Sequence, residues 1–336
     1  MMHYNRISVI VATYNQEETI GRTLDSILRQ KCHCPFEIVI GEDCSTDRTG
    51  AICQEYAKRY PQQIRLFSNL HNKGVVNNYM DCLLACQGEL IADCAGDDFW
   101  VDDEKLEKEL RIMESDEAIT LVHTAWRPYN EKTQTATDSP PQPFPAPVTD
   151  GKTMLEAIIT QTDMPVIHLC TALYRADTVV KAYHAHQALF RDPDIVCEDL
   201  QIAFFLAQNG KIAYLPDVTL HYSQGGETVS DPSDGRKAFR FFLLATRLSH
   251  RLSETANIHT KATEAFFSRR TFELLMHALR AHDPALRAEA IKSQKEWEAP
   301  ETLLIRTAKA VTAYEPLWKI ALLVRRILVR LKSSRH

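Results

Sequence analysis

The chain has 336 residues, 45% of them hydrophobic and 25% charged, which is typical of a globular protein with one large domain or two ordinary ones. The formal net charge of −5 argues against a general nucleic-acid-binding protein, so we expect no nucleic-acid partner. No run of about 18 apolar residues is present, and a strand pattern begins a few residues after Met1, so we expect neither a membrane span nor a signal peptide.

Nine cysteines lie between Cys32 and Cys197. Their number is odd, Cys32 and Cys34 are too close for an easy disulfide, and no CxxC pairs have the spacing of a zinc site. We therefore expect reduced thiols and, with them, a cytoplasmic protein.

The first 127 residues alternate short β-branched runs with helical patterns. The runs predict strands at residues 7–12, 36–40, 64–67 and 89–92, and the patterns after them predict helices at 17–28, 46–56, 76–85 and 102–114. A strand followed by a helix, four times in succession, predicts a parallel α/β sheet with right-handed crossovers. Ligands of such sheets bind at the carboxyl ends of the strands.

Polar side chains follow each of these strands, namely Thr13, Asp43, Asn72 and Asp97. Asp97 is directly followed by Asp98, and adjacent carboxylates suit Mg²⁺ or Mn²⁺, which share phosphate oxygens with a substrate. A solvated turn is the alternative, because Gly-Asp-Asp is also ordinary turn chemistry. The common position of the four polar clusters at strand ends favours a ligand site.

The next segments differ in kind. Residues 128–150 are rich in proline and lack periodicity, which predicts an extended loop that is either a lid over the site or a spacer. Beyond it, the patterns predict helices at 152–160 and 201–208 and strands at 169–175 and 211–215. Glu198 and Asp199 open the second of these helices, where the helix macrodipole favours acids in any case.

Residues 231–336 carry long helical patterns without strand signals. In the last pattern, 316–332, one face holds Leu317, Ile320, Val324, Ile327 and Leu331, and the opposite face is basic. Such a helix suits an anionic membrane surface, so we expect peripheral attachment to the cytoplasmic membrane face. Packing against the helical region or against a partner subunit, as in a homodimer, is the alternative.

These spaced motifs together resemble the family 2 glycosyltransferases, inverting enzymes with the Rossmann-like GT-A fold. The matching segments are residues 7–15, 37–49, 72–74 and 96–98, the last a DXD-like motif, with Glu198-Asp199 on a later helix. The resemblance covers about residues 5–225. It implies a GT-A domain at 1–230, made of a nucleotide-binding half (1–127), the proline-rich loop (128–150) and an acceptor half (151–230), followed by a helical region at 231–336.

The resemblance also implies roles for the nucleotide-binding half. Thr13 and Tyr14 would line the nucleotide pocket, and Asp43 would accept a hydrogen bond from the base, commonly uracil. Asp97 and Asp98 would be the ribose and metal carboxylates, with Asp98 the direct metal ligand.

Two further roles concern the acceptor half. Asp199, beside Glu198, would be the general base that deprotonates the acceptor hydroxyl. His221 would lie near the diphosphate and its metal, although a lone histidine is more often structural.

The expected activity is a metal-dependent transfer of one sugar, of hexosyltransferase type, with Mn²⁺ or Mg²⁺ as cofactor. The donor would be a nucleotide sugar, in this family commonly a UDP-sugar, and the acceptor a glycan or a lipid-linked sugar of surface polysaccharide synthesis. A non-catalytic nucleotide-sugar-binding or scaffold protein is the alternative, with Asp97, Asp98 and Asp199 counting against it. A sugar-phosphate nucleotidyltransferase or a dinucleotide oxidoreductase is disfavoured, because no glycine-rich loop follows the first strand.

The sequence departs from the family pattern at three places. Glu42 stands where many members have Asp, and Asn77, which we assign to the nucleotide contact, lies near the place of an arginine. A common Tyr-Arg after the last strand reads Tyr222-Ser223. The missing arginine affects a contact with the phosphates or the base. The change from Tyr-Arg to Tyr222-Ser223 affects product release and the handling of the diphosphate.

Overall fold

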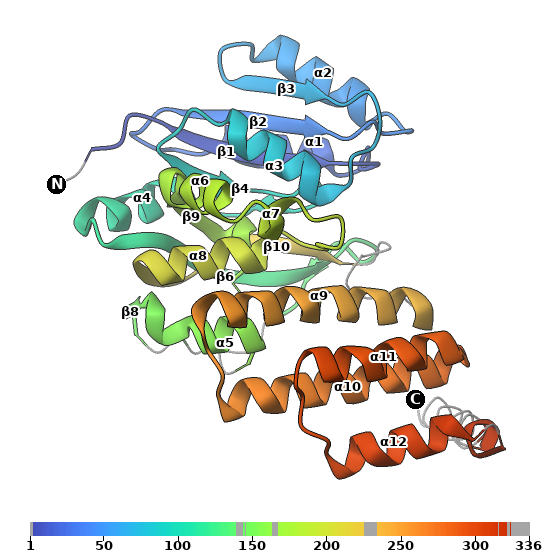
Figure 1. The fold of residues 1–336 in the computed structure, drawn as a ribbon. Coiled ribbons are helices and arrows are strands. Elements are labelled where there is room, and N and C mark those ends of the chain that lie inside the picture. Colours follow the sequence, from blue (N-terminus) through green and yellow to red (C-terminus); the bar gives the residue numbers. More distant parts are fainter. Residues whose placement is uncertain are drawn as a thin grey trace. The chain divides into compact units, whose positions relative to one another are not determined.

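The computed structural model describes residues 3–138, 144, 146–162, 167–224, 234–314, 316–320 and 323. The chain divides into two compact units, Met1–Gly226 and Glu227–His336. The first unit holds the predicted α/β sheet and the second is helical (Figure 1).

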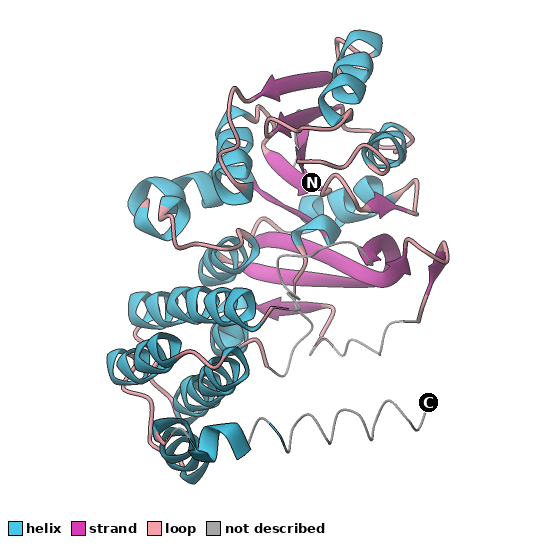
Figure 2. Cartoon of the chain, turned by 90° about the vertical axis from the view of Figure 1, so that its right-hand side faces the viewer, coloured by secondary structure: helices cyan, strands magenta, loops and turns pink. Residues whose placement is uncertain are grey.

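One mixed sheet forms the frame of the first unit, with helices on both sides of it (Figure 2). Its strand order is β3-β2-β1-β4-β9-β6-β10-β5. The bounds are β1 Ile7–Thr13, β2 Phe36–Glu42, β3 Ile64–Ser68, β4 Leu90–Asp93, β5 Phe99–Trp100, β6 Ile119–Asn130, β9 Ala172–Arg175 and β10 Lys211–Gln224.

The half of the sheet made of β1 to β4 confirms the predicted parallel arrangement. β1 pairs in parallel with β2 and with β4, and β2 pairs in parallel with β3. Helices α1 (Ile20–Leu28), α2 (Thr49–Arg59) and α3 (Val75–Ala85) connect these strands, and α4 (Lys105–Ser115) follows β5. The carboxyl ends of β1, β2 and β4 therefore meet at one edge of the sheet.

The other half is mixed. β9 runs antiparallel to both β4 and β6, whereas β10 runs parallel to β6. β5 leaves the neighbourhood of β4 and pairs antiparallel with β10, where Phe99 lies opposite His221. The Asp97-Asp98 loop therefore bridges two strands that are far apart in the order of the sheet.

The predicted loop at residues 128–150 differs from the structure at both ends. β6 continues to Asn130 because it pairs with β10 along nearly its whole length. Short strands β7 (Thr135–Ala136) and β8 (Val148–Asp150) pair with β6 and β10. The predicted strand at 169–175 begins as a 3-10 turn, Leu169–Thr171, before β9.

The remaining helices of this unit support the acceptor half. The predicted helix at 152–160 is a 3-10 turn, Gly151–Met154, followed by α5, Leu155–Thr160. The others are α6 Ala176–Ala185, α7 Ala188–Arg191 and α8 Asp199–Asn209.

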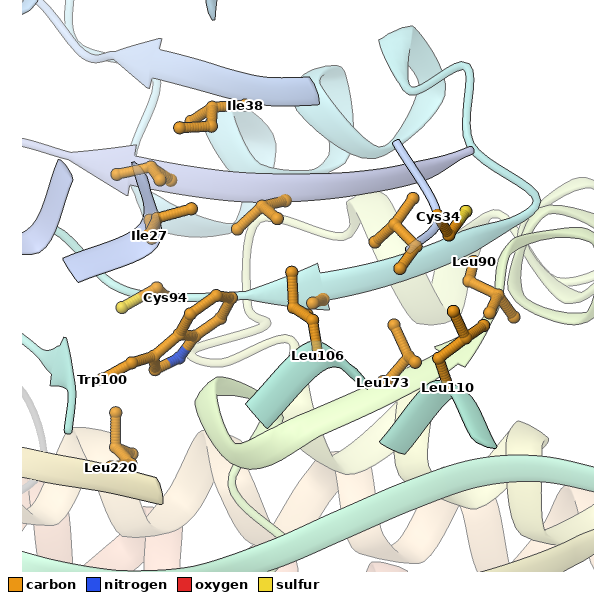
Figure 3. Close-up of a cluster of buried hydrophobic side chains, with 14 of the residues drawn as sticks. Ile27, Cys34, Ile38, Leu90, Cys94, Trp100, Leu106, Leu110, Leu173 and Leu220 are labelled. Carbon is orange, nitrogen blue, oxygen red and sulfur yellow. The ribbon is translucent and has the colours of Figure 1, made fainter. Parts of the chain in front are cut away.

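One apolar core of this unit lies between the sheet and helices α1 and α4 (Figure 3). Leu106 and Leu110 of α4 point toward β4 and β9, and the Trp100 ring lies between Cys94 and Leu220. Each of these side chains is at most 1% exposed. Because burial of a large apolar side chain contributes about 1.5–3 kcal/mol, this packing fixes the position of β5 directly after the Asp97-Asp98 loop.

The second unit is a bundle of helices with its own core, in agreement with the predicted helical region. Its described helices include α9 Gly235–Ala256, α10 Lys261–Ala281, α11 Pro284–Glu296 and α12 Leu303–Ala313. α10 packs against each of the other three. Asp283 caps α11 by accepting from the backbone N–H groups of Ala285 and Leu286, with Pro284 at the first helical position.

Only the beginning of the predicted tail helix 316–332 falls within the described residues. Residues 316–320 are helical, and Trp318 is 2% exposed, with its Nε1 donating to the Leu279 carbonyl at 2.9 Å. Leu317 and Ile320 are exposed, whereas Val324, Ile327 and Leu331 lie outside the described residues. No described helix is both long and apolar enough to cross a membrane.

Candidate functional site

The predicted nucleotide residues gather where β1, β2 and β4 end. The Asp43 N–H donates to the Thr13 carbonyl at 3.0 Å, and the Gly96 N–H donates to the Ala12 carbonyl at 3.2 Å. A side chain at Gly96 would place its Cβ 2.6 Å from Thr13 Oγ1, so this close approach requires glycine. Thr13 is buried, and Tyr14 is half-exposed beside it.

Asp43 is 2% exposed, and its carboxylate holds the loop that precedes α3. Its oxygens accept from the backbone N–H groups of Lys73 and Gly74, at 2.8 and 2.9 Å, and from Asn69 Nδ2 at 2.9 Å. A carboxylate has about four lone-pair positions, so little capacity remains for a nucleotide base. The structure thus gives Asp43 a loop-positioning role beside its predicted one.

Asn77 lies beside an arginine that the sequence pattern did not indicate. Arg191, at the end of α7, donates to the Asn77 carbonyl at 3.2 Å and forms an ion pair with Asp81 at 2.7 Å. Lys73 pairs with the same Asp81 at 2.8 Å. The Arg191 guanidinium therefore lies beside Asn77, near which the family pattern places an arginine of its own. Arg191 is 114 residues away from Asn77 in the sequence.

Three residues support the Asp97-Asp98 loop: Ser223, which the sequence marked only as a departure from the family pattern, and Arg22 and Glu131, which it did not indicate. The Ser223 N–H donates to Asp98 Oδ1 at 2.9 Å, and Ser223 Oγ donates to the Asp97 carbonyl at 2.6 Å. Arg22 of α1 donates to the same carbonyl at 3.1 Å and pairs with Glu131 at 2.6 Å. Strand β10, helix α1 and the end of β6 thus hold the loop in one conformation.

The electrostatics of this carboxylate pair fit a divalent cation. Burial raises the pKa of Asp98 well above its ordinary value, and the neighbouring charge of Asp97 raises it further. Burial also raises the pKa of Asp97, and Glu131 adds to this effect while Arg22 opposes it. Buried carboxylates that repel each other are stabilised by a cation, and their hard oxygen atoms suit Mg²⁺ or Mn²⁺.

His221 lies opposite Phe99 in the β5–β10 pair. Its ring stacks on Tyr129 with centroids 5.5 Å apart and contacts Phe99 edge-on at 5.2 Å. Its Nδ1 is buried without a hydrogen-bond partner among the described residues. Burial lowers the pKa of His221, and the charges of Arg127 and Arg22 lower it further, so the ring favours its neutral form. Its role toward a metal stays a prediction.

Glu198 and Asp199 form a second, separate carboxylate pair at the start of α8. Glu198 is the N-cap residue and Asp199 the first helical residue. Burial raises the pKa of both groups, and the charge of Asp199 raises that of Glu198 further. The backbone N–H of Leu169 hydrogen-bonds to Asp199 and opposes the shift of its pKa.

The two carboxylate pairs share a common neighbourhood. Burial raises the pKa of Cys170 and of Tyr222, and the charges of both Asp98 and Asp199 raise the pKa of each further. The Cys170 carbonyl accepts a hydrogen bond from Nε1 of Trp100, a core residue, at 3.1 Å, and this contact fixes the Cys170 backbone against the core. The charges of the β4–β5 loop and of α8 therefore act on the same two side chains.

The comparisons with known proteins agree with this architecture. The family model "Glycosyl transferase family 2" matches residues 8–181. An uncharacterized protein of Mycobacterium tuberculosis is 43% identical over 108 residues, which are 32% of this chain and 31% of that protein. The glucosyltransferase WfgD of Escherichia coli, described as UDP-Glc:alpha-D-GlcNAc-diphosphoundecaprenol beta-1,3-glucosyltransferase, is 30% identical over 107 residues, 32% of this chain and 40% of that protein. The chain thus spans less than half the length of these relatives.

Two solved structures share the fold at low identity. S. aureus TarS 1–349 in complex with UDP has a TM-score of 0.54 and 17% identity, over 91% of this chain and 90% of that one. The mannosyltransferase PcManGT of Pyrobaculum calidifontis, in complex with GDP-Man and Mn²⁺, has a TM-score of 0.50 and 18% identity, over 98% and 86% of the two chains.

Proposed function

Because the chain belongs to the family 2 glycosyltransferases, we propose that it moves a single sugar, with inversion, from a UDP-sugar to a glycan or lipid-linked acceptor. The transfer uses Mn²⁺ or Mg²⁺ and serves surface polysaccharide synthesis at the cytoplasmic face of the membrane. The name of the E. coli relative supports a lipid-linked acceptor, and the UDP in the TarS complex supports the nucleotide.

The observation that carries this proposal is that Asp98 and Asp199, which belong to separate carboxylate pairs, both influence the pKa of Cys170 and of Tyr222. Sugar transfer from a nucleotide needs negative charge at two places. One group holds the cation beside the diphosphate, and the other accepts a proton from the acceptor. A protein that only binds nucleotide sugars needs the first group alone.

The described residues divide this work between them. Asp97 and Asp98 would hold the cation, which neutralises the charge that develops on the departing diphosphate. The Ser223 N–H holds the Asp98 carboxylate, and Arg22 and Ser223 Oγ hold the backbone carbonyl of Asp97. Because these supports come from β10 and α1, the cation site is rigid before the donor binds.

Asp199 would accept the proton of the acceptor hydroxyl. Burial moves its pKa upward, toward the range in which a carboxylate accepts a proton efficiently at neutral pH. Its position at the start of a helix, with the Leu169 N–H as partner, fixes its orientation. Glu198 beside it is the nearest alternative base.

The proposal is tested by turnover of a panel of UDP-sugars and GDP-mannose, with and without Mn²⁺. We expect metal-dependent release of the nucleoside diphosphate by the wild-type chain and its loss in Asp98→Asn. Asp97→Asn should weaken metal-dependent UDP binding less than Asp98→Asn does. Asp103→Asn, at a half-exposed carboxylate near α4, is the matched control and should retain full activity.

Two results would contradict the proposal. Equal, metal-dependent UDP affinity in wild type, Asp97→Asn and Asp98→Asn, measured by calorimetry, would remove the metal assignment. Tight UDP-sugar binding without turnover, in the presence of Mn²⁺ and lipid-linked acceptors, would favour the non-catalytic binding protein.

A further inference from the structure

Three metal-binding side chains meet on the first unit, at the edge opposite the candidate catalytic site. His3 precedes β1, His33 precedes β2, and Glu114 lies in the last turn of α4. β1 and β2 are parallel, so the segments that lead into them lie at the amino ends of the strands. Asp97 and Asp98 follow the carboxyl end of β4, and the two sites are therefore separate.

The distances between the ligand atoms fit one tetrahedral metal ion. His33 Nε2 lies 3.4 Å from Glu114 Oε1, and His3 Nδ1 lies 3.7 Å from the same oxygen. All three ligand atoms lie within 4.8 Å of one another. Metal–ligand bonds of about 2.0–2.1 Å in a tetrahedron place the ligand atoms about 3.3–3.4 Å apart, so small side-chain rotations would complete the geometry.

Glu114 gives independent support for a ligand at this point. Its side chain is 10% exposed, and its Oε1 is buried without a hydrogen-bond partner among the described residues. A buried carboxylate oxygen without a hydrogen bond is costly, and the two histidine nitrogens that face it lie at 3.4 and 3.7 Å. A bound cation would satisfy it.

His33 also has the outer partner that metal-bound histidines usually have. Its second nitrogen, Nδ1, lies 2.7 Å from Glu107 Oε2. Glu107 in turn accepts from the His33 backbone N–H at 3.1 Å and from Arg111 Nε at 2.8 Å. A carboxylate on the far nitrogen fixes the tautomer in which Nε2 is free to bind a metal.

We propose that His3 Nδ1, His33 Nε2 and Glu114 Oε1 bind one Zn²⁺ ion, with water as the fourth ligand. Two imidazoles and one carboxylate favour zinc over Mg²⁺ or Ca²⁺, which prefer oxygen ligands only. The ion would join the segment before β1, the segment before β2 and the end of α4. It would thereby stabilise the amino edge of the sheet without taking part in sugar transfer.

The first test is calorimetric titration of ZnCl₂ into full-length protein freed of metal with a chelator, in the presence of excess Mg²⁺ to occupy oxygen-only sites. We expect one zinc ion per chain for the wild type and loss of this binding in His33→Ala. Glu107→Gln keeps all three ligands but removes the outer carboxylate, so it should weaken zinc binding by about 10- to 100-fold. His259→Ala, at another exposed histidine that faces a glutamate, is the matched control and should bind as the wild type does.

A second measurement distinguishes this site from the catalytic carboxylates. Co²⁺ in a tetrahedral site with nitrogen ligands gives strong visible absorption, which octahedral oxygen-ligated Co²⁺ lacks. We expect this absorption in the wild type and in Asp98→Asn, and its loss in His3→Ala, which should fold as the wild type does because this side chain is 86% exposed. Zinc binding of wild-type affinity and stoichiometry in both His3→Ala and His33→Ala would overturn the proposal and leave these contacts as simple histidine–glutamate ion pairs.

Discussion

At the scale of single residues, Asp199 is the side chain on which the proposed reaction depends most directly. Asn has nearly the same size and can still accept from the Leu169 N–H, but it cannot take a proton. We expect Asp199→Asn to lower turnover by about 10²–10⁴ and to leave UDP affinity unchanged, because a positioned general base contributes about that much. Turnover and calorimetric UDP binding of the same preparation check this. If turnover stays near that of the wild type, Glu198→Gln should be examined as the variant of the true base.

Asp93 is a second buried carboxylate whose environment is unusual. Its side chain is only 4% exposed. Burial raises its pKa from 3.8 to about 7, and the charge of Asp199 contributes to the shift. The hydroxyl groups of Tyr79 and Tyr174, which are 2.6 Å apart, lie nearby and oppose it.

This environment predicts a loss of stability as the pH rises. Asp93 binds its proton more tightly in the folded state than in the unfolded state, so its own contribution to the free energy of unfolding falls between about pH 4 and pH 7. Asp93→Asn removes the ionisation, and we expect it to be more stable than the wild type by a few kcal/mol at about pH 8 but similar to it at about pH 4. Urea unfolding at both pH values, with Asp103→Asn as control, measures the difference. An equal difference at both pH values would contradict the assignment.

At the scale of secondary-structure elements, the sequence predicts best where the signal is local. β1 to β4 are runs of apolar and β-branched residues, and their helices carry apolar stripes, so both appear in the chain order that was expected. The same order of strands and helices also predicts that the polar residues at the strand ends lie close together. Thr13, Asp43, Gly96 and the Asp97-Asp98 loop lie together because parallel strands end at the same edge.

The elements that were missed depend on distant parts of the chain. β5 has two residues and no pattern of its own, and it is defined by its pairing with β10, about 120 residues later. Arg22 occupies an ordinary position on an amphipathic helix, and nothing near it in the sequence indicates Glu131 or Ser223 as partners. Arg191 and the His3–His33–Glu114 cluster were missed for the same reason. The spacing of residues in a sequence indicates a binding site only when those residues lie on one helix or strand or belong to a known motif.

Alanine substitutions at two glycines, one beside β4 and one in α1, test how closely the backbone packs at each position. A Cβ at Gly88, just before β4, would lie 2.5–2.7 Å from backbone atoms of Ser8, Ile7 and Leu90, which cannot move without shifting strands. We expect Gly88→Ala to lower the free energy of unfolding by about 1–3 kcal/mol.

Gly21, in α1, is the matched control for this substitution. The nearest atom to its Cβ would be the Tyr56 hydroxyl oxygen at an ordinary 3.6 Å. Because Ala is the better helix former, Gly21→Ala should raise the free energy of unfolding by about 0.5–1 kcal/mol. Chemical denaturation of both variants measures the two changes, and a neutral result at Gly88 would show that β1 and β4 are less tightly apposed than described.

At the scale of the whole molecule, the α/β unit and the helical unit each have a separate core. The sequence predicted this division from the change in pattern after the last strand. It did not predict that Trp318 would be buried, because a tryptophan on a basic amphipathic helix is equally suited to a membrane interface. Its contacts with Leu279 and His282 attach the beginning of the tail to the helical unit.

This attachment leaves an apolar surface on the start of the tail. Leu317, Ile320 and Leu323 are 43%, 57% and 58% exposed. Leu317 and Ile320 belong to the stripe that the sequence predicts, whereas Leu323 lies outside it; Lys319 and the later Arg326 and Arg330 supply the basic face. We therefore expect the chain to bind anionic vesicles peripherally, each basic residue near the surface contributing about 1 kcal/mol.

Vesicle flotation with the full chain tests this expectation. Binding to anionic vesicles should fall with rising salt, because electrostatic attraction is screened, and should be absent with neutral vesicles. Replacing Leu317 and Ile320 with Ser should abolish flotation without lowering the melting temperature, since neither side chain is buried. The matched control replaces Leu303 and Leu304 of α12 with Ser; these are also exposed, at 75% and 62%, but lie outside the predicted tail. If wild type and both variants all fail to bind anionic vesicles, the stripe covers protein instead, and the acceptor must reach the enzyme without a tail-mediated membrane contact.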